Sequence, residues 1–538
     1  MKVLRISDTR YVWLMIAVSS ALALGVPCSA AVTMDGFITN IDSATSFDVR
    51  GTHVLLNDDA KCETETLDEA IVLKRKIYDG VRAHMYFILR DDLVPASVTE
   101  TPCKALEVHV GTRMALTGEQ RPTGVFAATH AVAYVVRNSK ILSTQQNPGT
   151  LRGGAIFEEP PEVHHTAQGW MGSMWLDGYP MGIVPQTALS AAPAGSKLIY
   201  GFVGFARQPR FQVKPSSACE SHSVPAGLFN PDMWGMYEGA RAANGNISAA
   251  RLCLWPNEAN DDGTDKGNKR KHRNLWRVHL ANYQLKRRGS IEMPHGRRLY
   301  ILPDQQLQDW LSRLGGEIVP QSKKTLPDSD PAKIRFRFYV VHATDPTLQY
   351  AINIAKGWTY GMKRPGFDDA AIAMPGGLVA VSDSTLARID NSAQLAAILS
   401  YAATSVLQKQ ASVRHDSLKY LGGGESGPSF TPYALAVLQD EQQMRIGIRQ
   451  MYLAGYDIRE APFAWAVAQG KPVANPMINS NHPDNEIPWY AAYAFDYISQ
   501  YYKDVDYSKL KRGRAEYQQF LQELYKADPS LPRPKAKE

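Results

Sequence analysis

The sequence predicts an α+β protein of several domains, in which β-rich modules precede a mainly helical domain that carries a β-hairpin. Short segments with partial apolar alternation and glycine punctuation fill much of residues 32–299, as expected for strands. Apolar residues at helical spacing dominate from about residue 300 onward. The length of 538 residues suits several domains of about 150 residues each.

The first 31 residues have the features of a secretory signal. Lys2, Arg5 and Arg10 precede an apolar run that reaches Val26, and the small-residue stretch CSAA follows it. The run is shorter than the roughly 20 residues that a membrane-spanning helix needs. We therefore expect an exported protein, periplasmic or secreted, with no stable membrane span after the signal is cleaved.

Four cysteines follow the signal segment: Cys62, Cys103, Cys219 and Cys253. An even number of cysteines in an exported chain favours disulfides. The pairing Cys62–Cys103 with Cys219–Cys253 is preferred among the three possible connectivities, because each bridge then stays inside one module. Free buried thiols are the alternative.

The net charge of +6 is modest, and the densest group of basic residues is the run KGNKRKHR at residues 266–273. A nucleic-acid surface would use such a run. However, Asp261, Asp262 and Asp265 stand beside it, so a solvated polar loop is the better interpretation. We expect no nucleic-acid partner.

Two β-rich modules are expected before residue 300. Residues 32–146, with segments such as DGFITNID and VGTRMALTG, resemble small bacterial β-barrel modules of the oligonucleotide-binding (OB) type. An insertion at about residues 62–105 interrupts this module and is expected to be partly helical. Residues 147–299 form the second module, with the aromatic segment GWMGSMWLDGYPMGIV.

The remaining chain is expected to be mainly helical. LPDQQLQDWLSRLGG has leucines at helical spacing, and Gly315 and Gly316 are expected to end that helix. DDAAIAMPGGLVAVS predicts two strands joined by a Pro-Gly-Gly turn, and a helix over residues 392–410 follows. Residues 506–538 are predicted to form a C-terminal helix and a disordered tail.

Five segments carry a resemblance to a known family: AAIAMPGG, LAAILSYAATS, QQMRIG, AGYDIREAP and NHPDNE, all between residues 370 and 486. In this order they resemble the zinc metallopeptidases that include CAAX prenyl endopeptidases, HtpX-like heat-shock proteases and β-barrel-assembly-enhancing proteases. The resemblance covers about residues 302–502. It implies a zincin-like domain of minigluzincin type at residues 300–505, with a zinc-binding H-E-x-x-H helix and a third-ligand Glu on a later helix.

The chain departs from the family at the positions that perform its chemistry. Tyr401 and Ser405 stand at the two histidine positions, Ala402 at the catalytic Glu, and Gln442 at the third-ligand Glu. A single amide does not replace two imidazoles and a carboxylate as a zinc site, and alanine cannot act as a base. The resemblance therefore implies a pseudopeptidase with no catalytic residues, no metal and no cofactor, which binds extended peptide or unfolded protein.

The hairpin of the family is kept at Met374, Pro375, Gly376, Gly377, Leu378 and Val379. In the family, an edge strand of this hairpin aligns the substrate in extended form. Strand addition needs only backbone hydrogen bonds and side-chain pockets. We expect a bound peptide to lie against the strand near Leu378 and Val381.

Two alternatives remain open. The first is an active zinc metalloendopeptidase with an unrecognised site, and only this alternative requires zinc as a cofactor. The residues available for such a site are His342, His415, His482, the pair His164 and His165, and the carboxylates Asp440 and Glu441. The second is an envelope structural or interaction protein that acts through its β-rich modules.

Overall fold

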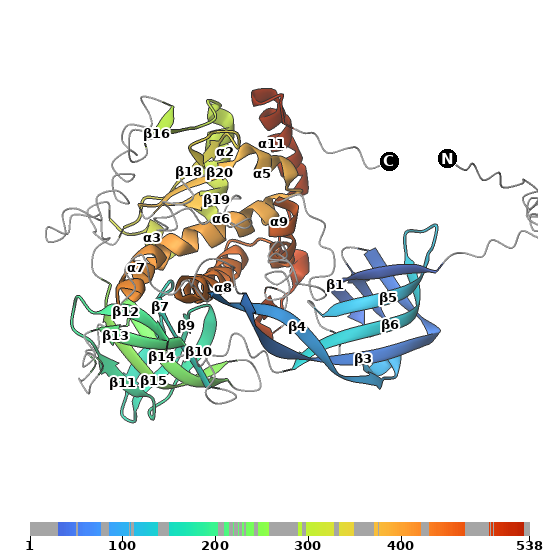
Figure 1. Cartoon of the computed structure of the whole chain (residues 1–538), viewed down its shortest axis with the longest axis horizontal. Helices are drawn as coiled ribbons and strands as arrows, with labels where there is room; N and C mark the ends of the chain where they lie inside the picture. The colour runs from blue at the N-terminus through green and yellow to red at the C-terminus, as the bar shows by residue number, and fades with distance from the viewer. Residues whose placement is uncertain are drawn as a thin grey trace, which may run out of the picture.

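The structure is a computed structural model, and it describes residues 31–49, 52–76, 85–106, 108, 112–137, 150–202, 209–214, 219, 224, 229–230, 233–241, 246–257, 289–292, 297–327, 333–348, 371–374, 376–420, 430–468, 494, 497–498 and 500–531. These residues form an α+β protein with two mixed β-sheets in its N-terminal half and helices mostly in its C-terminal half (Figure 1). Residues 1–30, which hold nearly all of the predicted signal segment, lie outside the described residues.

The first sheet has the strand order β2-β1-β5-β6-β3-β4, and β2 also pairs with β3. Its strands are β1 (Val32–Ser43), β2 (Ser46–Val49), β3 (Thr52–Lys76), β4 (Met85–Glu100), β5 (Arg113–Gln120) and β6 (Phe126–Arg137). β3 and β6 run parallel, and the other neighbours are antiparallel. Alternating apolar residues from these strands, such as Phe47, Met114 and Phe126, form a separate buried core.

The segment at residues 62–105, which was expected to be partly helical, is strand at residues 62–76 and 85–100. β3 continues through it and pairs with β4 from Glu63 opposite Glu100 to Lys76 opposite Met85. The residues have helical spacing, but pairing with a neighbouring strand decides their structure. A single stretch of sequence does not reveal that neighbouring strand. The predicted Cys62–Cys103 disulfide is confirmed, with a Cα–Cα distance of 5.2 Å, and the short helix η1 (Cys103–Ala105) follows it.

The second sheet has the order β7-β14-β15-β10-β9-β8, with β11 paired to β15. Its strands are β7 (Thr150–Ile156), β8 (Glu162–Thr166), β9 (Gly169–Leu176), β10 (Tyr179–Ile183), β11 (Ala188–Ala191), β14 (Met233–Arg241) and β15 (Ile247–Pro256). Two small ribbons are formed by β12 (Lys197–Phe202) with β13 (Pro209–Lys214), and by β16 (Ser290–Glu292) with β17 (Arg298–Tyr300). The Cys219–Cys253 disulfide is also confirmed.

A three-stranded sheet and the helices make up the rest. The strands are β18 (Arg337–Val341), β19 (Ala371–Ala373) and β20 (Leu378–Ser382), in the order β18-β20-β19. The helices are α2 (Gln305–Ile318), α3 (Gln321–Lys324), α5 (Asp383–Arg388), α6 (Ser392–Leu407), α7 (Gln410–Tyr420), α8 (Phe430–Leu453), α9 (Ala461–Ala468) and α11 (Arg514–Ala527), with short turns η5 (Ile458–Glu460) and η7 (Tyr507–Lys509). Several of these helices have an N-cap side chain. At the start of α6, the Asn391 side chain accepts a hydrogen bond from the Gln394 N–H.

The predicted stop at Gly315 and Gly316 is wrong, because α2 continues to Ile318. A Cβ atom on Gly315 would lie 2.5 Å from the Phe338 ring, so glycine at this position lets α2 pack closely on β18. A Cβ atom on Gly316 would meet nothing within 4 Å.

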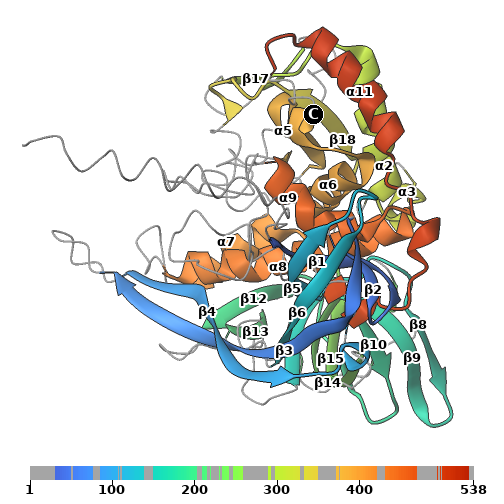
Figure 2. The same ribbon diagram turned by 90° about the vertical axis from the view of Figure 1, so that its right-hand side faces the viewer.

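The second sheet and the helices share one hydrophobic core. Its buried members include Met174 and Leu252 from the sheet and Leu399 and Met451 from α6 and α8. Figures 1 and 2 both show α6, α7 and α8 stacked on the second sheet, with α8 between α6 and the strands. One face of α8 therefore packs on α6, and the opposite face packs on the second sheet.

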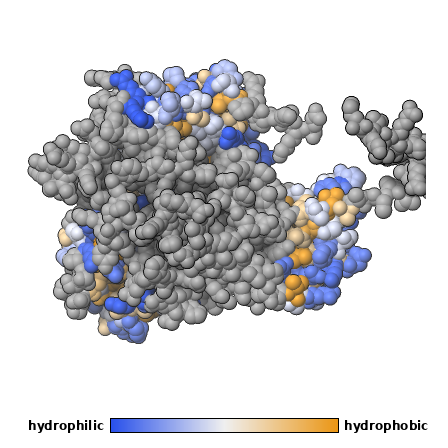
Figure 3. Space-filling model, viewed as in Figure 1, coloured by the Kyte–Doolittle hydropathy of each residue, from blue (hydrophilic) through white to orange (hydrophobic). Residues whose placement is uncertain are grey.

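Exposed apolar side chains are scattered. The large ones among the described residues are Val32, Val98, Val184, Tyr300 and Leu453, and Figure 3 shows hydrophilic and apolar residues side by side on the first sheet. Single exposed apolar residues are normal and do not mark a docking face. Among the helices that the structure describes, none is both long enough and apolar enough to cross a membrane.

Candidate functional site

The helix that carries Tyr401 and the helix that carries Gln442 pack directly against each other. At their closest approach, a Cβ atom on Gly447 of α8 would lie 3.1 Å from the backbone nitrogen of Tyr401 on α6. A larger residue at position 447 would push the helices apart. The structure thus brings together the two elements on which the family resemblance places the metal ligands.

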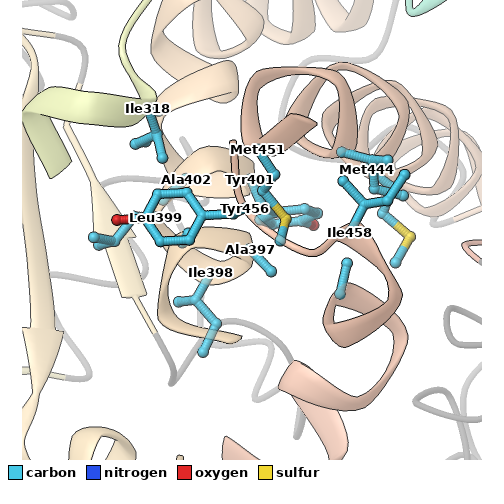
Figure 4. Packing of buried hydrophobic residues seen from close by; sticks show 14 of the residues in the cluster. Ile318, Ala397, Ile398, Leu399, Tyr401, Ala402, Met444, Met451, Tyr456 and Ile458 are labelled. Carbon is cyan, nitrogen blue, oxygen red and sulfur yellow. The ribbon is translucent and has the colours of Figure 1, made fainter. Parts of the chain in front are cut away.

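Of the three α6 positions of interest, Tyr401 and Ala402 are buried and Ser405 is partly buried. The Tyr401 hydroxyl donates to Asp440 Oδ1 at 2.7 Å, and Ser405 Oγ donates to the carbonyl of Ala402 on its own helix at 2.7 Å. Figure 4 shows Tyr401 and Ala402 inside the apolar cluster, near Met451. Tyr401, Ala402 and Ser405 themselves supply no imidazole to bind zinc and no carboxylate to activate water.

Gln442 is bonded at both ends of its amide group. Its Nε2 donates to the Gly154 carbonyl at 3.0 Å and to Asp177 Oδ1 at 2.9 Å, while its Oε1 accepts from Gln410 Nε2 at 2.9 Å. The one neutral oxygen that could have replaced the third ligand is thus already engaged. The residues at the family's zinc position do not fit a zinc ion.

The middle of α8 is buried on every face from residue 439 to residue 451. The polar side chains in this stretch are Gln439, Asp440, Glu441, Gln442, Gln443, Arg445, Arg449 and Gln450. Such residues are rarely buried without partners, since an unsatisfied polar group is costly away from water. Most of them bond to side chains of α6 and α7, to Glu158 and Glu159 just after β7, or to Asp177 in the turn between β9 and β10.

The first group of partners is the turn between β9 and β10. Asp177 and Gly178 both have positive φ values, 60° and 76°, as the Asp-Gly sequence of a tight hairpin turn favours. The turn enters the face of α8, where Arg445 donates to the Asp177 carbonyl at 2.8 Å and to its Oδ1 at 2.7 Å. Tyr237 donates to Asp177 Oδ2 at 2.9 Å, and burial and the nearby Asp177 charge raise the pKa of that phenol well above its usual value.

The second group of partners surrounds the adjacent acids Glu158 and Glu159. Glu158 accepts from Gln408 Nε2 at 2.9 Å and from Gln450 Nε2 at 2.6 Å. Arg449 makes a two-pronged bond to Glu159, at 2.8 and 2.6 Å, and its guanidinium lies 3.6 Å from the centre of the Trp175 ring. Burial raises the pKa of Glu158 to about 8.

Glu158 should make the stability of the chain depend on pH. Its pKa rises from 4.5 in the unfolded chain to about 8 in the fold, so the folded state holds a proton that the unfolded state has lost between those values. The free energy of unfolding should therefore fall, on the order of a few kcal/mol, as pH rises from about 5 to about 8. We expect Glu158→Gln to flatten this slope in urea unfolding measured across that range.

A matched control is Glu238→Gln, on the half-exposed Arg152–Glu238 pair of the same sheet. That variant should keep the wild-type slope. An unchanged slope in Glu158→Gln would show that Glu158 is not the titrating group.

The predicted hairpin is present. The Met374 N–H donates to the Leu378 carbonyl at 2.7 Å, and Gly377, with φ 88°, closes the turn by donating to the Met374 carbonyl. Pro375 lies outside the described residues.

The expected position of a bound peptide, next to Leu378 and Val381, needs correction. β20 pairs with β18 on one side and with β19 on the other, and all five of its residues are buried. It therefore has no free edge for a peptide. Among the described strands, β19 is the one at the hairpin edge of this sheet, since it pairs with β20 alone.

Among the residues that the structure describes, no group of three potential metal ligands includes Asp440 or Glu441. Within the described residues, the one grouping of three potential metal ligands is His342 with Asp383 and Asp528. His164 and His165 lie on β8, where His165 contacts the Trp170 ring. His482 and the side chain of His415 lie outside the described residues.

The sequence did not point to the partners of α8, which include Glu158, Glu159, Asp177 and Gln410, or to Gln408, which bonds to Glu158. One signal was available, since the segment QDEQQMRIGIRQ has polar residues on all sides at helical spacing. A helix that is polar all round needs either solvent or many specific partners. Here the partners lie more than 250 residues away for several bonds.

Comparison with known proteins gives no match, either to a family model or to a curated protein sequence. In the chain's own geometry, α6 and α8 pack together, and Tyr401 and Gln442 form part of a buried, hydrogen-bonded interface that reaches the second sheet.

Proposed function

We propose that this chain is an exported pseudopeptidase, built on a zincin-like scaffold, that binds extended peptide or unfolded protein and does not cleave it. The proposal rests on the packing of α6 against α8 and on the hairpin of β19 and β20 beside α6, which agree with the resemblance described above. The two disulfides support export, because disulfides persist in oxidising compartments.

The N-terminal module is included in the proposal as an OB-like β-barrel. The strand pairings support it, because they can be followed from β1 through β2, β3, β6 and β5 and back to β1, with β3 and β6 parallel. Five strands in this circuit, with one parallel neighbour, are what an OB-type module requires. Its fold alone does not assign it a ligand.

The main support for an inactive chain comes from the hydrogen bonds of the Gln442 amide. This amide joins α7 through Gln410 and the second sheet through Gly154 and Asp177. Zinc and a water molecule would have to displace these bonds and would still lack two imidazoles and a general base. The place where the family performs hydrolysis is an interior contact in this chain.

Peptide binding is assigned to the outer edge of β19. The Met374 N–H points to β20, and hydrogen-bonding directions alternate along an antiparallel strand, so the N–H of Ala373 points away from β20. Ala371 and Ala373 are both partly exposed, whereas Ile372 between them is buried. A peptide could therefore pair with this edge without disturbing the hairpin.

Replacing Ala373 by proline tests this assignment. Proline removes the outward N–H and leaves the bonds to β20, and proline is tolerated at strand edges for this reason. We expect the binding of an unfolded model substrate, such as reduced carboxymethylated casein, to weaken about 10-fold or more. Fluorescence anisotropy with labelled substrate measures the change.

The matched control is Ala373→Ser, which keeps the N–H and the small size and should bind like the wild type. Equal binding by the proline variant would refute the β19 site and would favour the β-rich modules as the binding surface. No binding by the wild-type chain would refute the proposed function itself.

A further inference from the structure

Three ligand-type side chains from distant segments meet at the far end of the three-stranded sheet. His342 directly follows β18, and Asp383 directly follows β20. These strands are parallel, with Val341 opposite Ser382, so their carboxyl ends place both side chains at one edge, where open sheets commonly bind ligands. Asp528 reaches the same point from the end of α11.

The two carboxylates are oriented alike. Asp383 Oδ1 accepts from the N–H groups of Ala343 and Ser384, at 2.9 and 2.6 Å. Asp528 Oδ1 accepts from the N–H and the hydroxyl of Ser530, at 3.0 and 2.6 Å. In each case, Oδ1 is held in place by donors and Oδ2 is turned toward the imidazole of His342.

The distances fit a small metal ion. His342 Nδ1 lies 2.9 Å from Asp383 Oδ2 and 3.6 Å from Asp528 Oδ2, and one ligand atom from each residue lies within 4.8 Å of the other two. Tetrahedral zinc with bonds of about 2.0 Å places its ligand atoms roughly 3.3 Å apart. The two observed separations lie on either side of that value.

The charges fit as well. Two carboxylates face one imidazole, so the group has a net charge of −1 when the imidazole is protonated and −2 when it is neutral. A divalent cation would balance the neutral form and displace a proton. Asp383 is buried, whereas the His342 side chain is about one third exposed (35%), so the group is open to solvent at His342.

We propose that His342, Asp383 and Asp528 bind one divalent transition-metal ion, with Zn²⁺ as the expected occupant and solvent in the fourth position. This site is separate from the α6–α8 contact. It is not part of the proposed peptide site, and it would fasten the end of α11 to the three-stranded sheet.

Titration of the full chain with Zn²⁺, in competition with a chromophoric chelator, tests this site. We expect one equivalent to bind, and His342→Ala to weaken binding about 100-fold or more, with Asp528→Asn weakening it at least about 10-fold. The matched control is His53→Ala, because His53 Nδ1 also lies 2.9 Å from an aspartate oxygen and 3.9 Å from a second one. Its loss should leave the zinc affinity unchanged.

Asp528→Asn changes the charge but not the shape of a side chain at the end of α11, so we expect this variant to fold. It therefore tests zinc binding even if His342→Ala fails to fold. The proposal is overturned if the wild type binds no Zn²⁺, if His342→Ala and Asp528→Asn both bind it as the wild type does, or if His53→Ala is the variant that loses it. None of these outcomes bears on casein binding at β19, so the two proposals fail or stand separately.

Discussion

Replacing Arg445 by alanine should lower the free energy of unfolding by about 3–5 kcal/mol, because it leaves the buried Asp177 carboxylate without its cation. Arg445 and Asp177 are each only 7% exposed at the side chain, and Nη2 lies 2.7 Å from Oδ1. A loss of this size is a large fraction of the 5–15 kcal/mol typical of folded domains. Guanidinium chloride unfolding, followed by tryptophan fluorescence, measures the loss.

The matched control is Arg152→Ala. Arg152 bonds to Glu238 at 2.9 Å on the same sheet, with both side chains about one third exposed. Because exposed ion pairs contribute little, we expect a loss below about 1 kcal/mol. Similar losses for the two variants would show that the Asp177 turn is not the buried anchor described above.

Replacing Gly447 by valine should also destabilise the chain strongly. The Cβ atom would lie 3.1 Å from the Tyr401 nitrogen and 3.4 Å from the Ser400 carbonyl carbon. These are backbone atoms, which cannot rotate away as a side chain does. Overpacking of this kind costs about 1–3 kcal/mol or more, and the same unfolding measurement applies.

Gly316→Val is the matched control, since Gly316 also lies within a helix but a Cβ atom there would meet nothing within 4 Å. The free energy of unfolding of that variant should equal the wild-type value or lie slightly above it, because glycine is itself unfavourable within helices. If both variants unfold alike, the close contact of α6 with α8 is not important for stability.

The sequence predicts the local features of this fold well. The α+β order, the hairpin around Gly377, the helix that begins at Ser392 and both disulfide pairings are all observed. The hairpin depends on the local Pro-Gly-Gly signal, and the disulfide pairings depend on the even number of cysteines and on keeping each bridge inside one module.

The features that were predicted wrongly all depend on distant partners. Residues 63–76 and 85–100 are strand because β3 and β4 pair there, and β20 is internal because β18 lies on its other side. Likewise, Gln442 contacts Asp177, 265 residues earlier in the chain. The resemblance places Gln442 at the position of the family's third ligand, but the sequence does not reveal that the turn between β9 and β10 lies beside it.

If the chain is the pseudopeptidase proposed above, the buried polar helix explains in physical terms why the scaffold is kept without catalysis. Once α8 is joined to the second sheet through Asp177 and to Glu158 and Glu159 through Gln450 and Arg449, its polar residues are needed for folding. Removing one partner of such a pair leaves the other unsatisfied. The contacts of α8 are then kept because the fold needs them, whether or not the chain cleaves peptides. Peptide binding is proposed at a different place, the edge strand β19.

The most direct test of the central claim is the cleavage of unfolded casein by the full chain, with added Zn²⁺ and separately with a chelator. The account predicts no cleavage above background under either condition, because Tyr401, Ala402, Ser405 and Gln442 supply neither a zinc site nor a base. Cleavage that requires Zn²⁺ and stops with the chelator would contradict it, and would establish the chain as an active zinc metalloendopeptidase.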